Sequence, residues 1–471
     1  MFTGRTKELN ILEKAYASDA FQMVIMYGRR RVGKTSILQH FASQKPQVIF
    51  CTARETSAAE NLGILSRSIM SQGPFPNESI DYESPAYATF EAALTPVFTK
   101  AADPQGAPRT LLIIDEYPYL AQSYPGISSL LQTLIDSTRE QSNLMLVLCG
   151  SSMSFMEHQV LGHQSPLYGR RTAQIKVEPF DVFDAARLMG AQSFEETLPF
   201  YAIAGGVPLY LKQFDCARPL VDNVSSVLEQ GSFLSIEPEN YLMQEVRTPA
   251  VYNAVIAALA AGETRISDIA NIVKAPASAV SQYMKTLIEL GIVERVTPVA
   301  FANKKQVIYR ISDNLFRFWY RFVPRYAAAL DLGLHDRVAH AIVENDFPTF
   351  MGPVFEQACR QWLAREIREG RIDMLPTRIG SWWGADTQRK EQAEINVAAI
   401  GADGELILGE CKWRTKPVDV DVLNLLAHRA SLLPGGNKHL YLFSKSGFTQ
   451  ECKQAAKRAN TTLIDAADML N

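Results

Sequence analysis

The sequence predicts an α/β protein of several domains, with a parallel sheet first, a mainly helical domain next and a second α/β domain last. Three observations predict this class. The 471 residues are enough for about three domains of roughly 150 residues each. Short apolar runs alternate with helical patterns up to about residue 215, which is typical of a parallel sheet covered by helices. Helical patterns then dominate up to about residue 330, and strand patterns return in residues 331–471.

The composition is that of an ordinary globular protein, with 47% hydrophobic and 21% charged residues. The net charge of -3 excludes a generally polycationic protein, so any nucleic-acid site must be local. Six widely spaced cysteines without a CxxC pair favour a reducing compartment over a zinc ribbon or a disulfide framework. No apolar run approaches the ~18 residues of a membrane span, and the N-terminus lacks a signal-peptide core. We therefore expect a cytoplasmic protein without a membrane partner.

The most informative stretch is GRRRVGKT at Gly28–Thr35, which fits the phosphate-binding pattern G-x-x-x-x-G-K-[ST]. Phe21–Tyr27 before it is predicted as a buried strand, and Ser36–Ala42 after it as a helix. Backbone N–H groups of such a loop, at a helix N-terminus, bind phosphate. A chance glycine-rich turn would not need this strand and helix. The predicted cradle comprises Gly28, Arg29, Arg30, Arg31, Val32, Gly33, Lys34, Thr35 and Ser36, with Lys34 reaching the outer phosphates and Thr35 binding magnesium.

A second buried strand, Thr110–Ile114, ends in Asp115 and Glu116. The carboxyl edge of a parallel sheet is where ligands bind, so the two acids are predicted beside the phosphate loop. Asp115 would hold magnesium through water, and Glu116 would polarise the attacking water. Two solvated acids at a strand end are the alternative, which the phosphate loop makes the weaker one. Because a strand at Gln47–Thr52 intervenes, we expect the P-loop class with an additional strand.

Further candidates lie downstream of the strand Asn143–Gly150. Ser151 or Ser152 at its end can sense the γ-phosphate, or the serines can simply cap the next helix. Arg170 and Arg171 lie in a turn-rich loop, where an arginine could stabilise transition-state charge within the chain or from a neighbouring subunit. They could equally be surface cations.

Two more segments complete the first domain. Phe2–Leu9 precedes a helix, for which Thr6 is the expected N-cap. Glycines beside a proline in Ala204–Tyr210 predict a close backbone approach, which includes Gly206 and Pro208.

Taken together, the motifs FTGRTKEL, GRRRVGKT, LLIIDEYPYL, CGSSMSFM, SPLYGRR and GGVPLYL resemble the archaeal-type ATPases related to AAA+ and STAND signalling proteins. The resemblance implies ATP or ADP with Mg²⁺ as cofactors, whereas spacing alone would also allow GTP. It further implies a Walker B pair, a first sensor, an arginine finger that would favour homo-oligomers, and an adenine-binding element. By this resemblance, Asp115 and Glu116 would be the Walker B pair, and Ser151 or Ser152 would be the first sensor. Arg170 or Arg171 would be the arginine finger, and Gly206 to Pro208 with Phe2 to Arg5 would form the adenine-binding element.

The middle of the chain predicts a winged helix. A helix at Val251–Ala260 is followed by short helices at Ile266–Val273 and Ser278–Leu290, and then by two alternating strands at 292–296 and 306–310. Residues 250–330 hold ten lysines and arginines against five acids, with Lys304 and Lys305 at the wing tip. This excess allows phosphate contacts to double-stranded DNA.

The predicted recognition helix is poorly equipped to read bases, offering Ser278, Ser281, Gln282, Lys285 and Thr286. A rigid relay of the nucleotide state is thus the alternative to DNA contact. The aromatic run Leu315–Phe322 resembles a stacking surface, but its helical spacing favours a core helix that joins two domains.

The last domain contains a second candidate site. A helix carrying Glu356, a strand carrying Glu394 and Asn396, and a strand carrying Glu410 and Lys412 resemble the restriction-endonuclease-like PD-(D/E)xK superfamily. Period-two geometry places each strand pair on one face. The resemblance implies magnesium-binding acids and a lysine that activates water. Asn396 stands where the family has aspartate, and an amide binds magnesium more weakly, so an active nuclease is not expected. A buried Glu410–Lys412 salt bridge is the alternative.

The predicted architecture is therefore a P-loop NTPase sheet (1–215, with a helical lid beginning near 180), a helical and winged-helix domain (216–330) and a restriction-endonuclease-like domain (331–471). The predicted function is an ATP-hydrolysing molecular switch that controls the winged helix and the nuclease-like domain. An ATP-regulated DNA nuclease and a non-catalytic DNA-binding scaffold remain as alternatives.

Overall fold

The computed structural model describes residues 2–72, 87–102, 108–300 and 306–470. These residues form two compact units, Met1–Pro179 and Phe180–Asn471. The division into three domains that the sequence suggests is not tested by this separation into two units and stays a prediction. The helical residues that follow Phe180, which were expected to form a lid on the first domain, share a hydrophobic core with helices and strands of the second unit.

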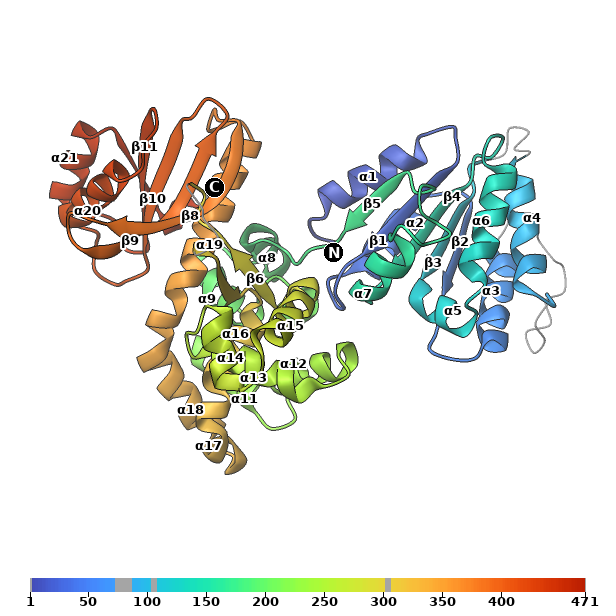
Figure 1. Ribbon diagram of the computed structural model, residues 1–471, viewed down its shortest axis with the longest axis horizontal. Coiled ribbons are helices and arrows are strands. Elements are labelled where there is room, and N and C mark those ends of the chain that lie inside the picture. Colours follow the sequence, from blue (N-terminus) through green and yellow to red (C-terminus); the bar gives the residue numbers. More distant parts are fainter. Residues whose placement is uncertain (1, 73–86, 103–107, 301–305, 471) are drawn as a thin grey trace. The chain divides into compact units, whose positions relative to one another are not determined.

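The first unit is built on a five-stranded sheet in the order β2-β3-β4-β1-β5, in which all neighbours are parallel (Figure 1). The strand β4 separates the strand before the phosphate loop from the strand that ends in Asp115, as expected for a P-loop sheet with an additional strand. The strand β5 was not predicted, because its sequence AQIK is short and half polar, as suits an edge strand. The strands are β1 Gln22–Tyr27, β2 Val48–Thr52, β3 Leu111–Asp115, β4 Met145–Gly150 and β5 Ala173–Lys176.

Helices cover both faces of this sheet. The apolar sides of α1 and α2 pack on one face, and α3 to α7 pack on the other. The central strands β3 and β4 are buried on both sides, which explains their continuous apolar runs. The helices are α1 Thr6–Tyr16, α2 Lys34–Ala42, α3 Ala58–Gln72, α4 Phe90–Ala102, α5 Tyr117–Ser123, α6 Ile127–Thr138 and α7 Met153–Phe155.

The second unit begins with helices and continues into a winged helix. Three helices and the antiparallel ribbon β6–β7 share one core, as predicted. Lys304 and Lys305 of the predicted wing tip lie outside the described residues. The elements are α8 Val182–Met189, α9 Phe194–Ala204, α10 Pro208–Leu211, α11 Leu220–Leu228, α12 Phe233–Glu245, α13 Pro249–Ala260, α14 Ile266–Val273, α15 Ala277–Glu289, β6 Val293–Val296 and β7 Ile308–Ile311.

The aromatic run forms the helix α16 (Asn314–Phe322) and is a core helix, not a stacking surface. Phe318 and Phe322 are buried in the core that α16 shares with α9 and α19. Phe316 and Tyr320 are buried in the winged-helix core. The helix therefore joins two cores, because its apolar side chains point in more than one direction.

The C-terminal part is a five-stranded mixed sheet in the order β12-β11-β10-β9-β8. The strands β8, β9 and β10 are antiparallel, and β10, β11 and β12 are parallel. The helix α19 packs on one face, and α20 and α21 pack on the other. The elements are α17 Ala327–Asp331, α18 His335–Ala341, α19 Phe347–Arg368, β8 Pro376–Asp386, β9 Glu391–Gly401, β10 Leu406–Lys412, α20 Val420–Ser431, β11 Lys438–Ser444, α21 Gln450–Arg458 and β12 Thr461–Asp465.

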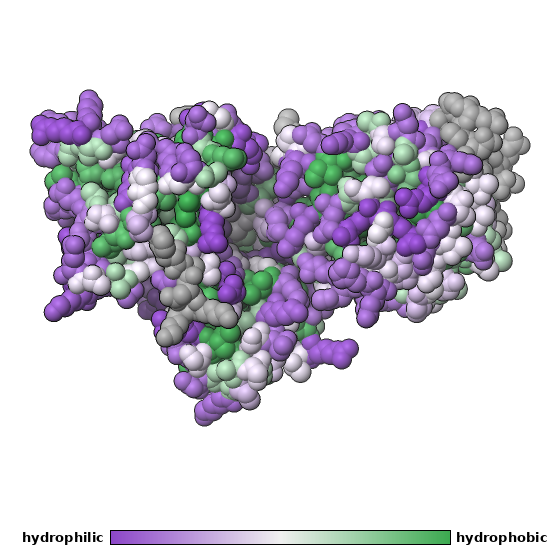
Figure 2. Space-filling model, turned by 45° about the horizontal axis from the view of Figure 1, so that its top comes forward, coloured by the Kyte–Doolittle hydropathy of each residue, from purple (hydrophilic) through white to green (hydrophobic). Residues whose placement is uncertain are grey.

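On the face shown in Figure 2, hydrophobic residues form small groups among hydrophilic ones. Within the described part of the chain, no helix has both the length and the hydrophobicity needed to span a membrane.

Candidate nucleotide-binding site

The phosphate loop connects β1 to α2 through two backbone positions that require glycine. At Gly28, a Cβ atom would lie 2.4 Å from the carbonyl oxygen of Val177, so no larger residue fits. Gly33 has φ 96° and directly precedes the first turn of α2, a left-handed conformation that favours glycine. The glycines of the motif thus shape the loop against β5 and aim it into the helix N-terminus.

Lys34 lies at the centre of the loop, and only 5% of it is exposed. Its Nζ donates hydrogen bonds of 2.9 Å to the carbonyl oxygens of Gly28 and Arg29. Burial lowers the pKa of Lys34 from its ordinary value, and the nearby acids Asp115 and Glu116 oppose that shift. A phosphate group would compete with the two carbonyl oxygens for the Lys34 ammonium group. The loop therefore already positions this positive charge where a phosphate would bind.

The other residues of the predicted cradle surround this lysine. Arg29 is buried, and Arg30 donates from Nη2 to the hydroxyl of Tyr119 at 3.2 Å. Arg31 adopts a left-handed conformation, with φ 70°. Val32 is fully buried, and Ser36 is exposed on the first turn of α2.

The hydroxyl of Thr35 meets the carboxylate of Asp115 directly, as the predicted magnesium site requires. Thr35 Oγ1 donates to Asp115 Oδ2 at 2.7 Å. Asp115 is 1% exposed, and its Oδ1 accepts from the backbone N–H of Glu116 at 3.1 Å. A hydroxyl and a carboxylate at this distance are ligands that suit Mg²⁺ with water and phosphate oxygens. Among the described residues, no group of three or more His, Cys, Asp or Glu is arranged to hold a metal ion.

Glu116 turns away from β3 in a left-handed conformation, with φ 53° and ψ 42°, immediately before α5. Its Oε2 accepts a hydrogen bond of 2.9 Å from Ser151 Oγ, at the end of β4. Ser152 instead precedes α7 as its N-cap residue. Of the two candidate sensors, the structure therefore brings Ser151 to the acid. The sequence could not separate them, because the choice depends on where β4 ends.

A role of Arg5 that the sequence did not predict is to brace the loop. Arg5 is 7% exposed, and its guanidinium donates to the carbonyl oxygens of Val32 and Glu178 at 2.7 Å each. It also pairs with Glu8 at 3.2 Å. Arg5 takes the N-cap position of α1 with φ 64° and no side-chain cap, so the prediction of Thr6 as the cap was wrong.

Phe2, also predicted near the base, stacks on His40 of α2, with ring centroids 4.1 Å apart and an interplanar angle of 7°. This contact places the N-terminal segment over the helix that begins at the phosphate loop. A role in enclosing a base remains a prediction.

Arg170 and Arg171 lie near the end of the sheet at which β1 begins, whereas the phosphate loop lies at the end at which β1 stops. The neighbouring Thr172 bonds to Met23, at the beginning of β1, whereas the phosphate loop follows the end of β1. The strand between these levels spans roughly 16 Å. Arg170 forms two hydrogen bonds of 2.8 and 2.5 Å to Asp136, and Arg171 donates to the carbonyl of Leu161.

The first unit therefore does not bring either arginine to its own phosphate loop. The predicted arginine finger within the chain does not fit this placement. A finger that reaches a neighbouring subunit remains a prediction.

Gly206 and Pro208 belong to the second unit. A Cβ at Gly206 would lie 1.8 Å from the carbonyl oxygen of Phe180, and the backbone N–H of Phe180 donates to Gly206 at 2.7 Å. The predicted close approach is therefore present, with the chain's own backbone as its partner. Pro208 begins α10. A contribution of the two residues to adenine binding remains a prediction.

The second candidate site is an ion-pair cluster. Glu410 is 3% exposed and accepts from Lys412 Nζ at 2.6 Å and from Arg429 of α20 at 3.2 Å. Arg429 also donates to the carbonyl of Glu394 at 2.8 Å. Two cations thus hold the carboxylate that the nuclease interpretation assigns to magnesium.

Asn396 and Glu394, the two candidate residues of β9, differ in their surroundings. The pairing of β8 with β9 has an irregularity between Gly380 and Trp382, opposite Asn396, so the alternation of side chains is interrupted. Asn396 is 8% exposed, and its Oδ1 accepts from the backbone N–H of Cys411 at 3.0 Å. The Glu394 side chain is exposed. The side-chain amide of Asn396 thus links β9 to β10 at the point where the backbone pairing of these two strands ends.

Glu356 lies on α19, 3.9 Å from Arg360. Burial raises its pKa to about 7, and Glu394 and Glu410 act in the same direction, against Arg360 and Arg310. An acid that retains its proton near neutral pH is a weak magnesium ligand.

Comparisons with known proteins assign the parts of the chain. Residues 2–214 match the family described as an ATPase domain predominantly from Archaea. Residues 253–295 match the arsR family of bacterial regulatory proteins, a helix-turn-helix. Residues 319–423 match a family of archaeal and bacterial proteins of unknown function. The chain therefore contains a domain similar to that archaeal ATPase family and a helix-turn-helix similar to that of the arsR family. The likeness of its last part to restriction endonucleases stays a prediction.

Individual relatives agree with this assignment. An uncharacterized protein of Methanocaldococcus jannaschii is 27% identical over 457 residues, which cover 96% of this chain and 97% of that protein. An uncharacterized ATP-binding protein of the same organism is 41% identical over 54 residues, or 11% of this chain and 92% of that protein. Among solved structures, a Walker-type ATPase of Pyrococcus abyssi aligns with a TM-score of 0.51 and 20% identity, covering 68% of this chain and 96% of that one. This last likeness shows the fold.

Proposed function

We propose that the first unit binds and hydrolyses ATP, and that the nucleotide state controls the winged helix and the C-terminal domain. The observation that carries the proposal is one unbroken set of contacts. Lys34 is held in the phosphate loop, Thr35 is bonded to Asp115, and Glu116 is bonded to Ser151. These are the groups that phosphoryl transfer to water requires.

Each group has a chemical task. Lys34 and the loop N–H groups bind the β- and γ-phosphates and neutralise their charge. Thr35 and Asp115 would hold Mg²⁺, which would supply positive charge to neutralise the phosphate oxygens. Glu116 orients the attacking water and accepts its proton. Ser151 holds the Glu116 carboxylate in place, so the position of this acid depends on the end of β4.

The ArsR-like module supports DNA as the partner of the second unit. Ser281, Gln282 and Lys285 of α15 are exposed, where they can contact phosphates and base edges. The contacts of Lys34, Thr35 and Glu116 described above all lie in the first unit, whereas the ArsR-like module lies in the second. A coupling between nucleotide binding and DNA binding would therefore have to connect the two units.

The experiment compares the full-length protein with Lys34→Ala and Glu116→Gln. We expect Mg²⁺-dependent phosphate release from ATP to fall by at least about a hundredfold in both variants. Glu116→Gln should still bind ATP, because Glu116 does not hold the phosphates, whereas Lys34→Ala should bind it weakly. DNA affinity measured with ATP-bound Glu116→Gln and with ADP tests the coupling. Equal hydrolysis in all three proteins would refute the proposal.

A further inference from the structure

A cationic pocket of about 570 Å³ lies in the second unit, far along the chain from the phosphate loop. We call it the arginine pocket. Three walls form it: the ribbon β6–β7 with the segment that follows β6, the helix α19, and the strand β8. Its lining includes Arg295, Arg310, Arg360 and Arg378, and a single acid, Glu294. Neither the ATPase site nor the exposed face of the recognition helix α15 contributes to this lining.

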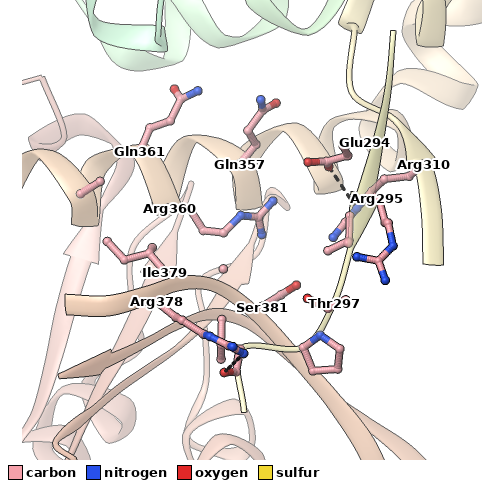
Figure 3. A pocket seen from close by; sticks show the side chains of 15 residues that line it. Glu294, Arg295, Thr297, Arg310, Gln357, Arg360, Gln361, Arg378, Ile379 and Ser381 are labelled. Carbon is pink, nitrogen blue, oxygen red and sulfur yellow. Dashed lines mark hydrogen bonds and ion pairs between the residues drawn. The ribbon is translucent and has the colours of Figure 1, made fainter. Parts of the chain in front are cut away.

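The four guanidiniums come from separate elements and meet around one space. Figure 3 shows Arg360 extending from α19 toward the ribbon that carries Arg295 and Arg310. In the same view Arg378 and Ser381 lie below Arg360, and Thr297 lies to the right of Ser381. Like charges brought together around a cavity repel one another unless an anion compensates them. Convergence of this kind is typical of sites that bind anions.

The charges of the arginines are only partly compensated by the residues around them. Glu294 pairs with Arg310 at 3.2 Å, and Glu356 lies 3.9 Å from Arg360. Arg360 donates to the backbone carbonyl of Asn396 at 2.8 Å, and Arg378 donates to that of Val299 at 3.3 Å. Carbonyl oxygens orient a guanidinium without neutralising it. Each arginine has five N–H donors, so donors remain for a bidentate contact to phosphate.

The walls are held together before any ligand binds. The backbone N–H of Val299 donates to the carbonyl of Ser381 at 3.0 Å, and Val299 is buried in the core of the C-terminal sheet. Arg360 is fixed to β9 through Asn396. A site formed in advance loses less entropy when it binds a ligand.

We propose that the arginine pocket binds a nucleotide-sized ligand that carries at least two phosphate groups, and that this ligand links the base of the wing to the C-terminal domain. The volume lies within the roughly 300–1,000 Å³ of small-molecule sites. Arginine forks match phosphate oxygens. The Gln357 amide and the hydroxyls of Thr297 and Ser381 can bond to sugar or base.

The test measures ligand binding by calorimetry at low salt with the full-length Lys34→Ala protein, in which the phosphate loop no longer competes. The probes are inorganic pyrophosphate and the 5′-phosphorylated dinucleotide pApA. We expect saturable binding of both, with pApA the tighter, and a loss of at least about tenfold in Arg295→Gln/Arg378→Gln. Both arginines are exposed, so this variant should fold.

The control is Arg218→Gln/Arg337→Gln, which removes the same charge from exposed positions of the same unit outside the pocket and should bind like the parent. Arg295→Lys/Arg378→Lys should bind with intermediate affinity, because it keeps the charge but loses the fork. Unchanged binding in the glutamine variant would overturn the proposal. The proposal would also be overturned if a short DNA duplex bound this variant less tightly than the parent while neither small probe bound. ATP hydrolysis plays no part in this test, so its outcome is independent of the ATPase proposal.

Discussion

At the scale of single residues, the nucleotide site depends on side chains that hold one another. Asp115 and Glu116 follow one another in the chain but turn to different partners, Thr35 and Ser151. The left-handed backbone at Glu116 makes this divergence possible. Because of this hydrogen bond, we propose that Ser151, rather than Ser152, is the serine that matters for hydrolysis.

Ser151→Ala should lower the rate of ATP hydrolysis by at least about tenfold, because Glu116 loses the hydroxyl that orients it. The binding of ATP should change little, since neither residue holds the phosphates. Ser152→Ala is the matched control, with the same chemical change one residue further on, and should retain the parental rate. The measurement is steady-state phosphate release, with ATP binding followed separately. A larger loss in Ser152→Ala would assign the sensor to that residue.

The pKa of Glu356 predicts a pH dependence of stability. Burial raises this pKa from 4.5 to about 7, so the folded protein keeps a proton that the unfolded chain releases in this range. The free energy of unfolding should therefore fall as pH rises from about 4.5 to about 7, by about 3 kcal/mol, and then level off.

Glu356→Gln should remove this contribution and make the protein more stable than the parent at pH 8. Urea unfolding of both proteins between pH 5 and pH 8, with tryptophan fluorescence as the signal, measures the difference. Parallel pH profiles of the two proteins would show that Glu356 does not titrate in this range.

At the scale of elements, the phosphate loop is shaped by its neighbours as well as by its motif. Gly28 is pressed against Val177 after β5, and Arg5 connects α1 to the loop and to Glu178. The N-terminal segment and the edge strand thus support the loop from two sides.

Arg5→Ala should loosen the loop, because the buried carbonyl oxygen of Val32 and the partly buried one of Glu178 lose their donor. The loss at the buried oxygen costs about 1–3 kcal/mol. We expect weaker binding of ATP and faster amide hydrogen exchange in residues 28–35. The exposed Arg139 provides the control Arg139→Ala, which should behave like the parent. Unchanged exchange in Arg5→Ala would mean that the loop keeps its conformation without this brace.

At the scale of the whole molecule, the two candidate sites differ in how their charges are arranged. The first unit directs its acids to a hydroxyl and a phosphate loop, where a cation and a nucleotide can bind. The C-terminal sheet instead neutralises Glu410 with Lys412 and Arg429 and uses Asn396 to join two strands. Its ion pairs fit a structural or binding role better than magnesium catalysis.

The parent protein should therefore leave supercoiled plasmid DNA intact in Mg²⁺ or Mn²⁺. Asn396→Asp restores a carboxylate beside Glu410 and should allow slow nicking, which the additional change Lys412→Ala should abolish. Agarose gels of plasmid incubated with each protein provide the measurement. Cleavage by the parent that Lys412→Ala abolishes would instead identify an active nuclease.

The sequence alone was sufficient to predict the parts whose signals are local. The phosphate loop, the acids after β3, the helices and ribbon of the winged helix, and the core nature of α16 each depend on residues close together in the chain. A buried strand or an amphipathic helix has a characteristic pattern wherever it packs. The edge strand β5 lacked such a pattern, as its exposed positions are polar.

Tertiary structure alone decided which side chains meet. Ser151 rather than Ser152 reaches Glu116, Arg5 braces a loop more than twenty residues away, and Arg170 and Arg171 lie at the far edge of the sheet. Asn396, predicted as a weakened metal ligand, accepts a hydrogen bond from the backbone N–H of Cys411 on the neighbouring strand. The four arginines of the arginine pocket are spread over residues 295–378. Such meetings depend on strand order, register and packing, which bring distant residues together without leaving a local pattern.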